Sequence, residues 1–409
     1  MYDNNELVEK VVLFCVDLDN GEDVEVNLDE LEELVKTAGA VVVGRLVQKK
    51  DSIDKATYIG SGKTEELRDL VLETGATGVV CDDELSPMQL KNLEDIVDTK
   101  IMDRTMVILD IFAGRATTRE GKIQVELAQL KYRSSRLIGM RSSLSRLGGG
   151  IGTRGPGEKK LEIDRRIIRD RISQLQKELE DVKQHREVMR KQRMIGNLPI
   201  VSIVGYTNAG KSTLLNKLTD AGVLEEDKLF ATLDPTSRNY KLSNGQEVIV
   251  TDTVGFIRKL PHHLINAFRS TLEEAKYADI ILHVVDISNP QADNHILTVY
   301  DTLSSLGVVD KPIITAFNKI DKVDTIPIIK DFKADKIIHI AAKKAIGFDD
   351  LSTSLEETIN NFRNYIEKTI PYTDAGLLNK IRKYGTILEE DYREDGIFVK
   401  AYVEKDFNI

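Results

Sequence analysis

Two kinds of hydrophobic pattern alternate along the first part of the chain. Short runs rich in β-branched residues predict strands at Val11–Val16, Val41–Leu46, Gly78–Cys81 and Ile101–Met102. Apolar residues at helical spacing predict helices at Leu28–Thr37, Lys63–Thr74 and Pro87–Val97. Alternation of strands with helices is typical of a parallel sheet. We therefore predict an N-terminal parallel α/β domain over residues 1–112.

A longer helical pattern occupies residues 113–196. Apolar residues recur first at Ile123, Leu127, Leu130 and Leu137, and after a break at Leu161, Ile168, Ile172, Leu175, Leu179 and Val182. Steps of three, four and seven are those of a two-helix coiled coil. Between the two sets, residues 147–160 contain six glycines and a proline, a composition that predicts no helix. The pattern predicts an antiparallel helical hairpin with a flexible tip at 147–160.

The remaining patterns predict two more domains. The apolar runs Pro199–Val204, Glu247–Thr251, Pro312–Phe317 and Lys336–Ile340 predict strands of an α/β domain over 197–362. In the tail, Glu367–Pro371, Gly385–Leu388 and Ile397–Val403 look extended, and Leu377–Tyr384 looks helical. We predict a small C-terminal α+β domain over 363–409.

A phosphate-binding motif directly follows the strand predicted at Pro199–Val204. Residues Gly205 to Ser212 fit G-x-x-x-x-G-K-[ST] and lead into a helix. In such a loop the backbone N–H groups surround a phosphate, Lys211 reaches the β- and γ-phosphates, and Ser212 binds Mg²⁺ directly. The candidate nucleotide-binding residues are Gly205, Tyr206, Thr207, Asn208, Ala209, Gly210, Lys211, Ser212 and Thr213.

Further nucleotide signals follow at the ends of later strands. Asp252 can hold Mg²⁺ through water, and the Gly255 N–H can contact the γ-phosphate. The Asp321 carboxylate can accept hydrogen bonds from the N1–H and amine of guanine, which adenine does not offer. The base-binding candidates in these segments are Asn318, Lys319, Asp321, Ala341, Ala342 and Lys343. Together these signals predict a GTP site rather than an ATP site.

The segment around Thr232 lies where a switch that closes over the γ-phosphate is expected. Thr232 is our candidate for a direct Mg²⁺ ligand there, with Thr236 as the alternative. Phe256, the residue after Gly255, has an apolar ring that cannot orient an attacking water. We predict slow hydrolysis by the protein alone, near ~10⁻⁴ s⁻¹, and faster hydrolysis with a partner. Lys211, Thr232 and Gly255 are the candidate catalytic residues.

Charge is distributed unevenly along the chain. The net charge is −10, yet the segment from Gly114 to Ile195 holds 21 Lys and Arg against 10 Asp and Glu. Solvation alone does not need an excess of one sign, whereas flexible segments rich in glycine and arginine fit structured RNA. The candidate RNA contacts are Arg136, Arg141, Arg146, Arg154, Lys159, Lys160, Arg165 and Arg166.

These motifs resemble the HflX family of bacterial ribosome-associated GTPases. The resemblance is carried by Gly205–Ser212, Ala231–Thr236, Asp252–Phe256 and, most specifically, the glycine-rich tip Gly148–Glu158. It extends through Tyr58–Lys63, Asp103–Thr105, Leu109–Ala113 and Gln124–Leu130, and so covers nearly the whole chain.

The resemblance implies a GTPase that binds the large ribosomal subunit (50S) through rRNA and splits stalled or stressed 70S ribosomes. Its tip would reach toward the peptidyl-transferase region. Asn208 also resembles the residue that helps hold K⁺ in cation-activated GTPases; the alternative is that Asn208 only braces the loop. Two departures from the family pattern are the added charge of Lys159 and Lys160, and Ala341 in place of serine. The second predicts weaker or faster-exchanging nucleotide, with the Ala342 N–H still reaching the guanine oxygen.

Other hypotheses are weighed against this one. A second hypothesis treats the hairpin as a nucleotide-gated RNA-binding module, an RNA chaperone or antibiotic-site displacer, in which hydrolysis is incidental. A tRNA-modification GTPase is disfavoured because no C-terminal cysteine exists, and an Obg-type factor because the N-terminal domain lacks dense glycine repeats.

The remaining features predict a cytoplasmic monomer without a membrane span. Cys15 and Cys81 are the only cysteines and lie in or beside apolar runs, which indicates buried thiols in a reducing cytosol. The longest apolar runs are too short to cross a bilayer. Residues Gly60–Thr64 imitate a phosphate loop, but Thr57 stands where its first glycine belongs, so a plain glycine turn is favoured. Residues Asp82–Glu84 are either a cation site or, as we favour, a solvated turn that caps the next helix.

Overall fold

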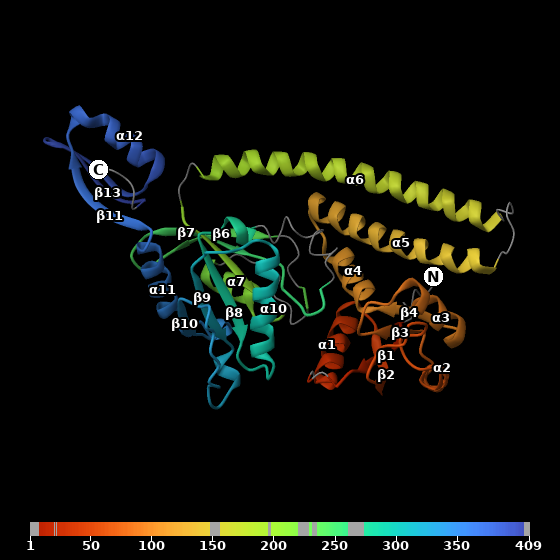
Figure 1. Cartoon of the computed structure of the whole chain (residues 1–409). Coiled ribbons are helices and arrows are strands. Elements are labelled where there is room, and N and C mark those ends of the chain that lie inside the picture. Colours follow the sequence, from red (N-terminus) through yellow and green to blue (C-terminus); the bar gives the residue numbers. More distant parts are fainter. Residues whose placement is uncertain are drawn as a thin grey trace, which may run out of the picture. The chain divides into compact units, whose positions relative to one another are not determined.

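The computed structural model describes residues 8–19, 21, 23–147, 156–194, 198–219, 229–230, 235–260 and 274–404 (Figure 1). Contacts group the chain into two compact units. The first comprises Met1–Leu179 with Lys259–Ala267, and the second Glu180–Arg258 with Phe268–Ile409. The predicted class is confirmed: an N-terminal α/β part, a helical hairpin, an α/β nucleotide-binding part and a small α+β part. The exact boundaries at 112, 196 and 362 stay predictions.

The first unit contains a four-stranded parallel sheet with the order β2-β1-β3-β4. Its strands are β1 (Lys10–Asp17), β2 (Val41–Lys49), β3 (Gly78–Cys81) and β4 (Lys100–Asp103). Its helices are α1 (Val24–Thr37), α2 (Ser61–Thr74), α3 (Pro87–Val97) and α4 (Arg104–Arg115). The predicted strands and helices are confirmed, β3 and α3 with the same bounds and the others with longer ends, whereas α4 was not predicted.

Both faces of this sheet are covered, as a parallel sheet requires. Side chains alternate along β1, so that Val12, Phe14 and Val16 pack on one face with Leu67 of α2 and Leu93 of α3. Helices α1 and α4 cover the opposite face (Figure 1). Cys15 and Cys81 are free, buried thiols. Burial raises the pKa of Cys15 to about 12 and that of Cys81 well above its usual value, so both remain protonated.

The turn after β3 is only partly solvated, which corrects one expectation: Asp82 is buried and paired, whereas Glu84 is exposed. Asp82 is 2% exposed and lies 3.0 Å from the Arg104 guanidinium and 3.1 Å from Lys259 Nζ. Arg104 also pairs with Glu30, and Lys259 with Asp83. The cap of α3 is instead Ser86, which forms a capping box with Gln89. Arginine and lysine side chains therefore supply the positive charge at this turn.

A two-helix hairpin follows the sheet, and its second helix runs on past Leu179, the last residue of this stretch of the first unit. Its helices are α5 (Arg119–Leu147) and α6 (Pro156–Met194). Ile123 and Leu127 of α5 pack against Leu175 and Leu179 of α6, the pairing of an antiparallel hairpin. Glu126 Oε1 accepts a hydrogen bond of 2.8 Å from Arg171 Nε, and Glu126 Oε2 one of 3.0 Å from Arg171 Nη2.

The predicted tip is shorter in the structure. Residues 148–155 lie outside the described part, and α6 already begins at Pro156, so 156–160 are helical. Proline is compatible with the first helical turn, because its missing N–H would have no partner inside the helix there. Our expectation that the whole of 147–160 is non-helical was therefore wrong at both ends, at Leu147, which ends α5, and at 156–160.

The second unit is built on a six-stranded sheet with the order β10-β9-β8-β5-β7-β6. Its strands are β5 (Ile200–Gly205), β6 (Thr236–Lys241), β7 (Glu247–Asp252), β8 (Ile280–Asp286), β9 (Ile313–Asn318) and β10 (Lys336–His339). Only β6, at the edge, runs antiparallel to its neighbour. Helices α7 (Lys211–Thr219) and α11 (Phe348–Asn360) share one hydrophobic cluster with the sheet, and α10 (Ala292–Ser305) also contacts it (Figure 1).

The C-terminal part is a three-stranded antiparallel sheet with one helix. Strands β11 (Arg363–Ile370), β12 (Thr386–Arg393) and β13 (Gly396–Glu404) take the order β11-β13-β12. Helix α12 (Ala375–Tyr384) packs Leu378 and Ile381 on this sheet. The predicted α+β tail is confirmed.

Candidate active site

The phosphate-binding loop follows β5, a central strand whose side chains are buried. Two of its glycines are required by geometry. A Cβ at Gly205 would lie 2.3 Å from the Val284 carbonyl oxygen, and a Cβ at Gly210, where φ is +97°, would lie 2.3 Å from Asn318 Nδ2. No side chain fits at such distances, so the loop needs glycine at both positions. Asn208 has φ 60° and an exposed side chain.

Lys211 begins α7 and is buried within the loop. It is 6% exposed, and its Nζ donates a hydrogen bond of 2.8 Å to the Tyr206 carbonyl oxygen. Burial lowers the pKa of Lys211 to about 8, although the nearby Asp252 carboxylate acts in the opposite direction. The ammonium group is thus held in place by the loop that would surround a phosphate.

Two of the three predicted magnesium residues, Ser212 and Asp252, meet. Ser212 Oγ donates a hydrogen bond of 2.8 Å to Asp252 Oδ2, and Asp252 is fully buried at the end of β7. A hydroxyl and a carboxylate at this distance are hard oxygen donors of the kind that Mg²⁺ prefers. These residues therefore fit a magnesium ion held beside the loop.

Gly255 and Phe256 lie directly against the loop. A Cβ on Gly255 would meet Thr207 Cγ2 at 2.8 Å and Lys211 Nζ at 3.0 Å. Phe256 is 1% exposed, and its backbone pairs with that of Tyr206. The Phe256 ring is therefore an interior group, which agrees with the expectation that it does not orient water.

The predicted guanine-binding residues also meet at this loop, through an asparagine. Asn318 Nδ2 donates to the Ala209 carbonyl at 2.8 Å, and its Oδ1 accepts the Ala342 N–H at 2.9 Å. Asn318 thus joins the phosphate-binding loop to the turn after β10. The Ala342 N–H, which we expected to reach the guanine oxygen, is bonded to Asn318 in this structure.

Two charged pairs flank the expected base position. Lys319 Nζ lies 2.7 Å from the Asn208 carbonyl and 2.7 Å from Asp286 Oδ2. Asp321 Oδ2 lies 3.3 Å from Lys344 Nζ, and the Asp321 side chain is 17% exposed. The sequence analysis missed Asp286 and Lys344. Asp286 ends the buried strand β8 just as Asp252 ends β7, so the signal that would have found it was present.

Several predicted residues are placed elsewhere or lie outside the described part. Thr232 lies outside the described residues. The alternative switch residue Thr236 is the first residue of β6 and pairs with Asp252 across the sheet. Thr213 lies on α7, and Ala341 and Lys343 lie in the turn after β10.

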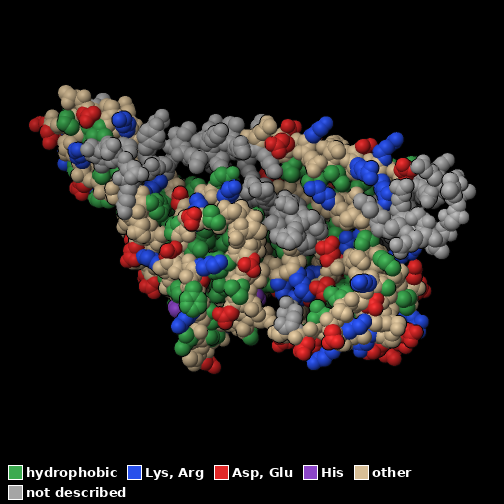
Figure 2. Space-filling view, in the orientation of Figure 1, with side chains coloured by type: hydrophobic (Ala, Val, Ile, Leu, Met, Phe, Trp, Pro, Cys, Tyr) green, Lys and Arg blue, Asp and Glu red, His purple; other side chains and the backbone are tan. Residues whose placement is uncertain are grey.

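The candidate RNA contacts fall into three groups: largely buried side chains, one exposed side chain, and side chains outside the described part. Arg136 is 12% exposed and lies 2.6 Å from Asp103 Oδ2, while Arg165 is 9% exposed. Both side chains are largely buried in this structure, and their contact with RNA stays a prediction. Arg166 is exposed. The side chains of Arg141, Arg146, Arg154, Lys159 and Lys160 are outside the described part. Figure 2 shows Lys and Arg mixed with Asp and Glu along the described part of α6.

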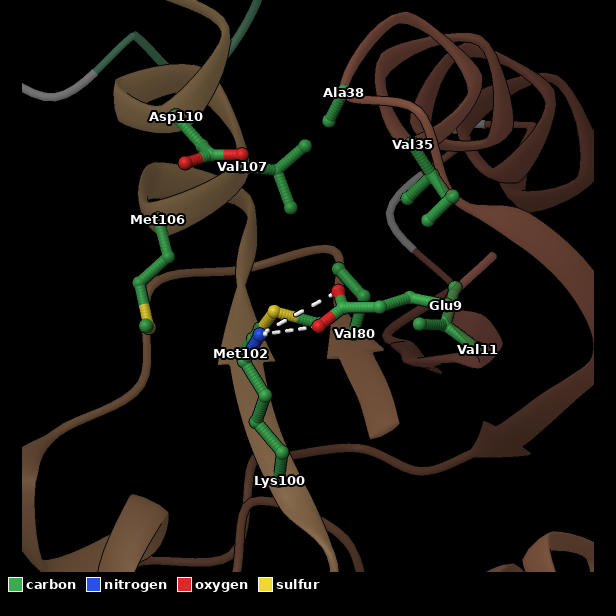
Figure 3. A pocket seen from close by; sticks show the side chains of 11 residues that line it. Glu9, Val11, Val35, Ala38, Val80, Lys100, Met102, Met106, Val107 and Asp110 are labelled. Carbon is green, nitrogen blue, oxygen red and sulfur yellow. Dashed lines mark hydrogen bonds and ion pairs between the residues drawn. The ribbon is translucent and has the colours of Figure 1, made fainter. Parts of the chain in front are cut away.

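A separate pocket of about 140 Å³ lies in the first unit. Val11, Val35, Val80 and Val107 line it, and Glu9 and Lys100 form an ion pair of 3.1 Å beside them (Figure 3). The pocket lies at the amino ends of β1 and β4, whereas ligands of parallel sheets bind at the carboxyl ends. Its apolar lining does not suit a phosphate.

Comparison with known proteins agrees with the geometry of the nucleotide site. Residues 25–113 match a family described as GTP-binding GTPase N-terminal, and 115–193 match GTP-binding GTPase Middle Region. Residues 200–319 match a family described as 50S ribosome-binding GTPase. No helix in the described ranges is long and apolar enough to cross a membrane.

Similar whole proteins carry one name. The chain is 64% identical to the GTPase HflX of Lacrimispora saccharolytica over 97% of this chain and 94% of that protein. It is 39% identical to the GTPase HflX of Escherichia coli over 97% and 93%. Among solved structures, a GTP-binding protein of Sulfolobus solfataricus in complex with GDP is 25% identical over 87% of this chain and 99% of that chain, with a TM-score of 0.44.

Proposed function

The chain belongs to the HflX family of GTPases, and on that premise we propose that its GTP cycle drives binding to the large ribosomal subunit and splitting of stalled or stressed 70S ribosomes. It is a GTPase with a P-loop nucleotide site. The observation that carries the ribosomal part is the basic excess between Gly114 and Ile195, on a hairpin in the same chain as that site. The description of the family matched at 200–319, a 50S ribosome-binding GTPase, supports the same partner.

The catalytic assignment follows from the geometry around Lys211. Its ammonium group stabilises the charge that develops on the γ-phosphate, and the Gly255 N–H adds a second donor. Ser212 and Asp252 would hold Mg²⁺, which neutralises charge on the β- and γ-phosphate oxygens. Thr232 is the candidate that closes over the ion. No side chain at Phe256 orients the water, so a partner that supplies this function raises the rate.

The RNA contact is proposed for the tip and its flanks. The described middle of α6 carries charge of both signs, so the positive excess is concentrated in residues whose side chains the structure does not describe. Of the eight candidates, Arg166 is exposed and Arg136 and Arg165 are largely buried. The side chains of the other five, Arg141, Arg146, Arg154, Lys159 and Lys160, lie outside the described part. Binding through such residues weakens steeply with salt, because each phosphate contact releases counterions.

The test is GTP hydrolysis with and without purified large ribosomal subunits, together with sedimentation of 70S ribosomes in GTP. We expect subunits to raise kcat by on the order of 10²-fold or more, and the 70S peak to decrease. Gly255→Ala, whose added methyl would lie 2.8 Å from Thr207 Cγ2, is expected to bind GTP but hydrolyse it slowly. Gly376→Ala is the matched control, since its Cβ meets nothing within 4 Å.

The variant separates the proposed function from its alternative. The contrary outcome is that Gly255→Ala splits ribosomes and displaces ligands bound to RNA for as many rounds as the unaltered protein does. In that case hydrolysis would be incidental, and the chain would be a nucleotide-gated RNA-binding module. If subunits changed neither the rate nor the sedimentation, the ribosomal role would be wrong.

We also propose that Asn208 contributes to a K⁺ site beside the phosphates. Its exposed side chain on a left-handed backbone is free of the tight packing around the rest of the loop. We expect GTP hydrolysis to be at least several-fold faster in KCl than in NaCl of equal ionic strength, and Asn208→Ala to remove the difference. Equal rates in both salts would leave Asn208 as a brace of the loop.

A further inference from the structure

The segment Thr253–Arg258, which includes the Gly255 N–H proposed to contact the γ-phosphate, is hydrogen-bonded to β5 and the phosphate-binding loop at several points. Thr253 Oγ1 donates to the Ile203 carbonyl at 2.8 Å. The Phe256 N–H donates to the Gly205 carbonyl at 3.1 Å, and the Thr207 N–H donates to the Phe256 carbonyl at 2.7 Å. These bonds lay the backbone on either side of Gly255 along β5 and the start of the loop.

The side chain of Tyr206 extends this fastening beyond Phe256. Its hydroxyl oxygen accepts the Arg258 N–H at 2.8 Å. Its ring stacks on His295 of α10, with ring centroids 3.6 Å apart and planes 4° from parallel. Tyr206 is 5% exposed, so the ring is fixed between the loop and α10. A residue that only had to complete the loop would not need a hydroxyl aimed at Arg258.

This arrangement distinguishes the two nucleotides. A Cβ added to Gly255 would lie 2.8 Å from Thr207 Cγ2 and 3.0 Å from Lys211 Nζ, the groups beside which a γ-phosphate must sit. Because even a carbon bonded to Gly255 would lie closer to these two groups than van der Waals contact allows, the gap between Gly255 and the loop is too narrow to admit a phosphate oxygen. GTP therefore has to move Gly255 off the loop, whereas GDP, which lacks the γ-phosphate, does not.

We propose that Tyr206 is a positioning residue that favours GDP by holding the segment Thr253–Arg258 against the phosphate-binding loop. Its hydroxyl bond to Arg258 has to break, or lengthen, when the γ-phosphate displaces Gly255. The stack on His295 keeps the hydroxyl in place. This inference rests on nucleotide binding alone and does not depend on the ribosomal role proposed above.

The experiment compares the Kd of GDP and of a non-hydrolysable GTP analogue for the full chain and for Tyr206→Phe. Phenylalanine keeps the ring and removes only the hydroxyl. We expect the analogue to bind about two- to tenfold more tightly relative to GDP, because the loss of one hydrogen bond has that effect. Both Kd values are measured for each protein, and the expected result is the change in their ratio.

Two sets of variants guard against a general effect on folding. Tyr402→Phe is the matched control, because Tyr402 is also 5% exposed and its hydroxyl accepts one neutral N–H, from Asn244, at 2.9 Å. It should leave the ratio of affinities unchanged. His295→Ala should shift the ratio in the same direction as Tyr206→Phe, while His295→Phe, which restores a stacking ring, should return it to the original value.

An unchanged ratio in Tyr206→Phe, with GDP binding intact, would overturn the proposal. So would equal weakening of both nucleotides, which would make Tyr206 a structural residue of the loop. Either result would leave the GTPase activity and its response to ribosomal subunits as they are, so failure here is distinguishable from failure of the proposed function.

Discussion

Replacing Asp321 by Asn is expected to change the preferred nucleotide from GTP to XTP. The Asp321 carboxylate can only accept hydrogen bonds, which matches the N1–H and 2-amino group of guanine. Asparagine presents a donor in place of one acceptor, and xanthine presents a carbonyl oxygen in place of the amine. We expect GTP affinity to fall by about 10³-fold or more and XTP affinity to rise, since sites built on buried polar groups reject mismatched partners by such factors.

Equilibrium binding of labelled GDP and XDP measures this exchange directly. Asp324→Asn is the matched control, because Asp324 lies three positions away, is exposed and has no part in the proposed site. Its affinities should match those of the unaltered chain. If Asp321→Asn kept its preference for GTP, the base would be read elsewhere, and the pair formed by Asp321 and Lys344 would be structural.

The parts of this fold that the sequence predicts are those governed by local rules. Short runs of β-branched residues located the parallel strands of both sheets except β8, which we did not predict, because most of these strands are buried by their own β-branched residues. The phosphate-binding loop was recognisable because Gly205 and Gly210 meet the backbone of β8 and the side chain of Asn318 so closely that no other residue fits. Here the local motif and the tertiary contact impose the same requirement.

The misses have a common physical cause, which is pairing between residues distant in sequence. Arg136 looks like a surface arginine in a basic stretch, but its partner Asp103 lies 33 residues earlier. In the sequence, Asp82 belongs to an acidic turn that we expected to be exposed. In the fold, Arg104 and Lys259, which are distant in sequence, pair with it. Charge patterns along the chain give the number of basic groups, whereas the fold decides which of them remain on the surface.

Asn318 illustrates the same limit at the nucleotide site. The motif predicts an asparagine after β9, but nothing in the sequence states that it joins the Ala209 carbonyl, 109 residues earlier, to the Ala342 N–H. The Asn318 side chain thus holds both the phosphate-binding loop and the base-binding turn. A substitution that moves Asn318 is therefore expected to disturb the binding of both the phosphates and the base.

Gly210→Ala is therefore expected to abolish nucleotide binding although alanine adds only a methyl group. The new Cβ would lie 2.3 Å from Asn318 Nδ2, on a backbone with φ +97°. Asn318 must withdraw, which frees the Ala209 carbonyl and the Ala342 N–H together. We expect the Kd of both GTP and GDP to rise by about 10²-fold or more, and the free energy of unfolding to fall by roughly 2–4 kcal/mol.

Gly245→Ala separates the collision from the backbone strain. Gly245 has a similar φ of +88°, but a Cβ there meets only Lys241 Cε, at 4.0 Å. This variant bears the strain of an alanine at positive φ, about 1 kcal/mol, without touching Asn318. It should bind GTP and GDP normally and unfold at a slightly lower temperature. Equal nucleotide affinity in the two variants would mean that Asn318 does not join the loop to the base-binding turn, since the collision with Asn318 is what distinguishes them.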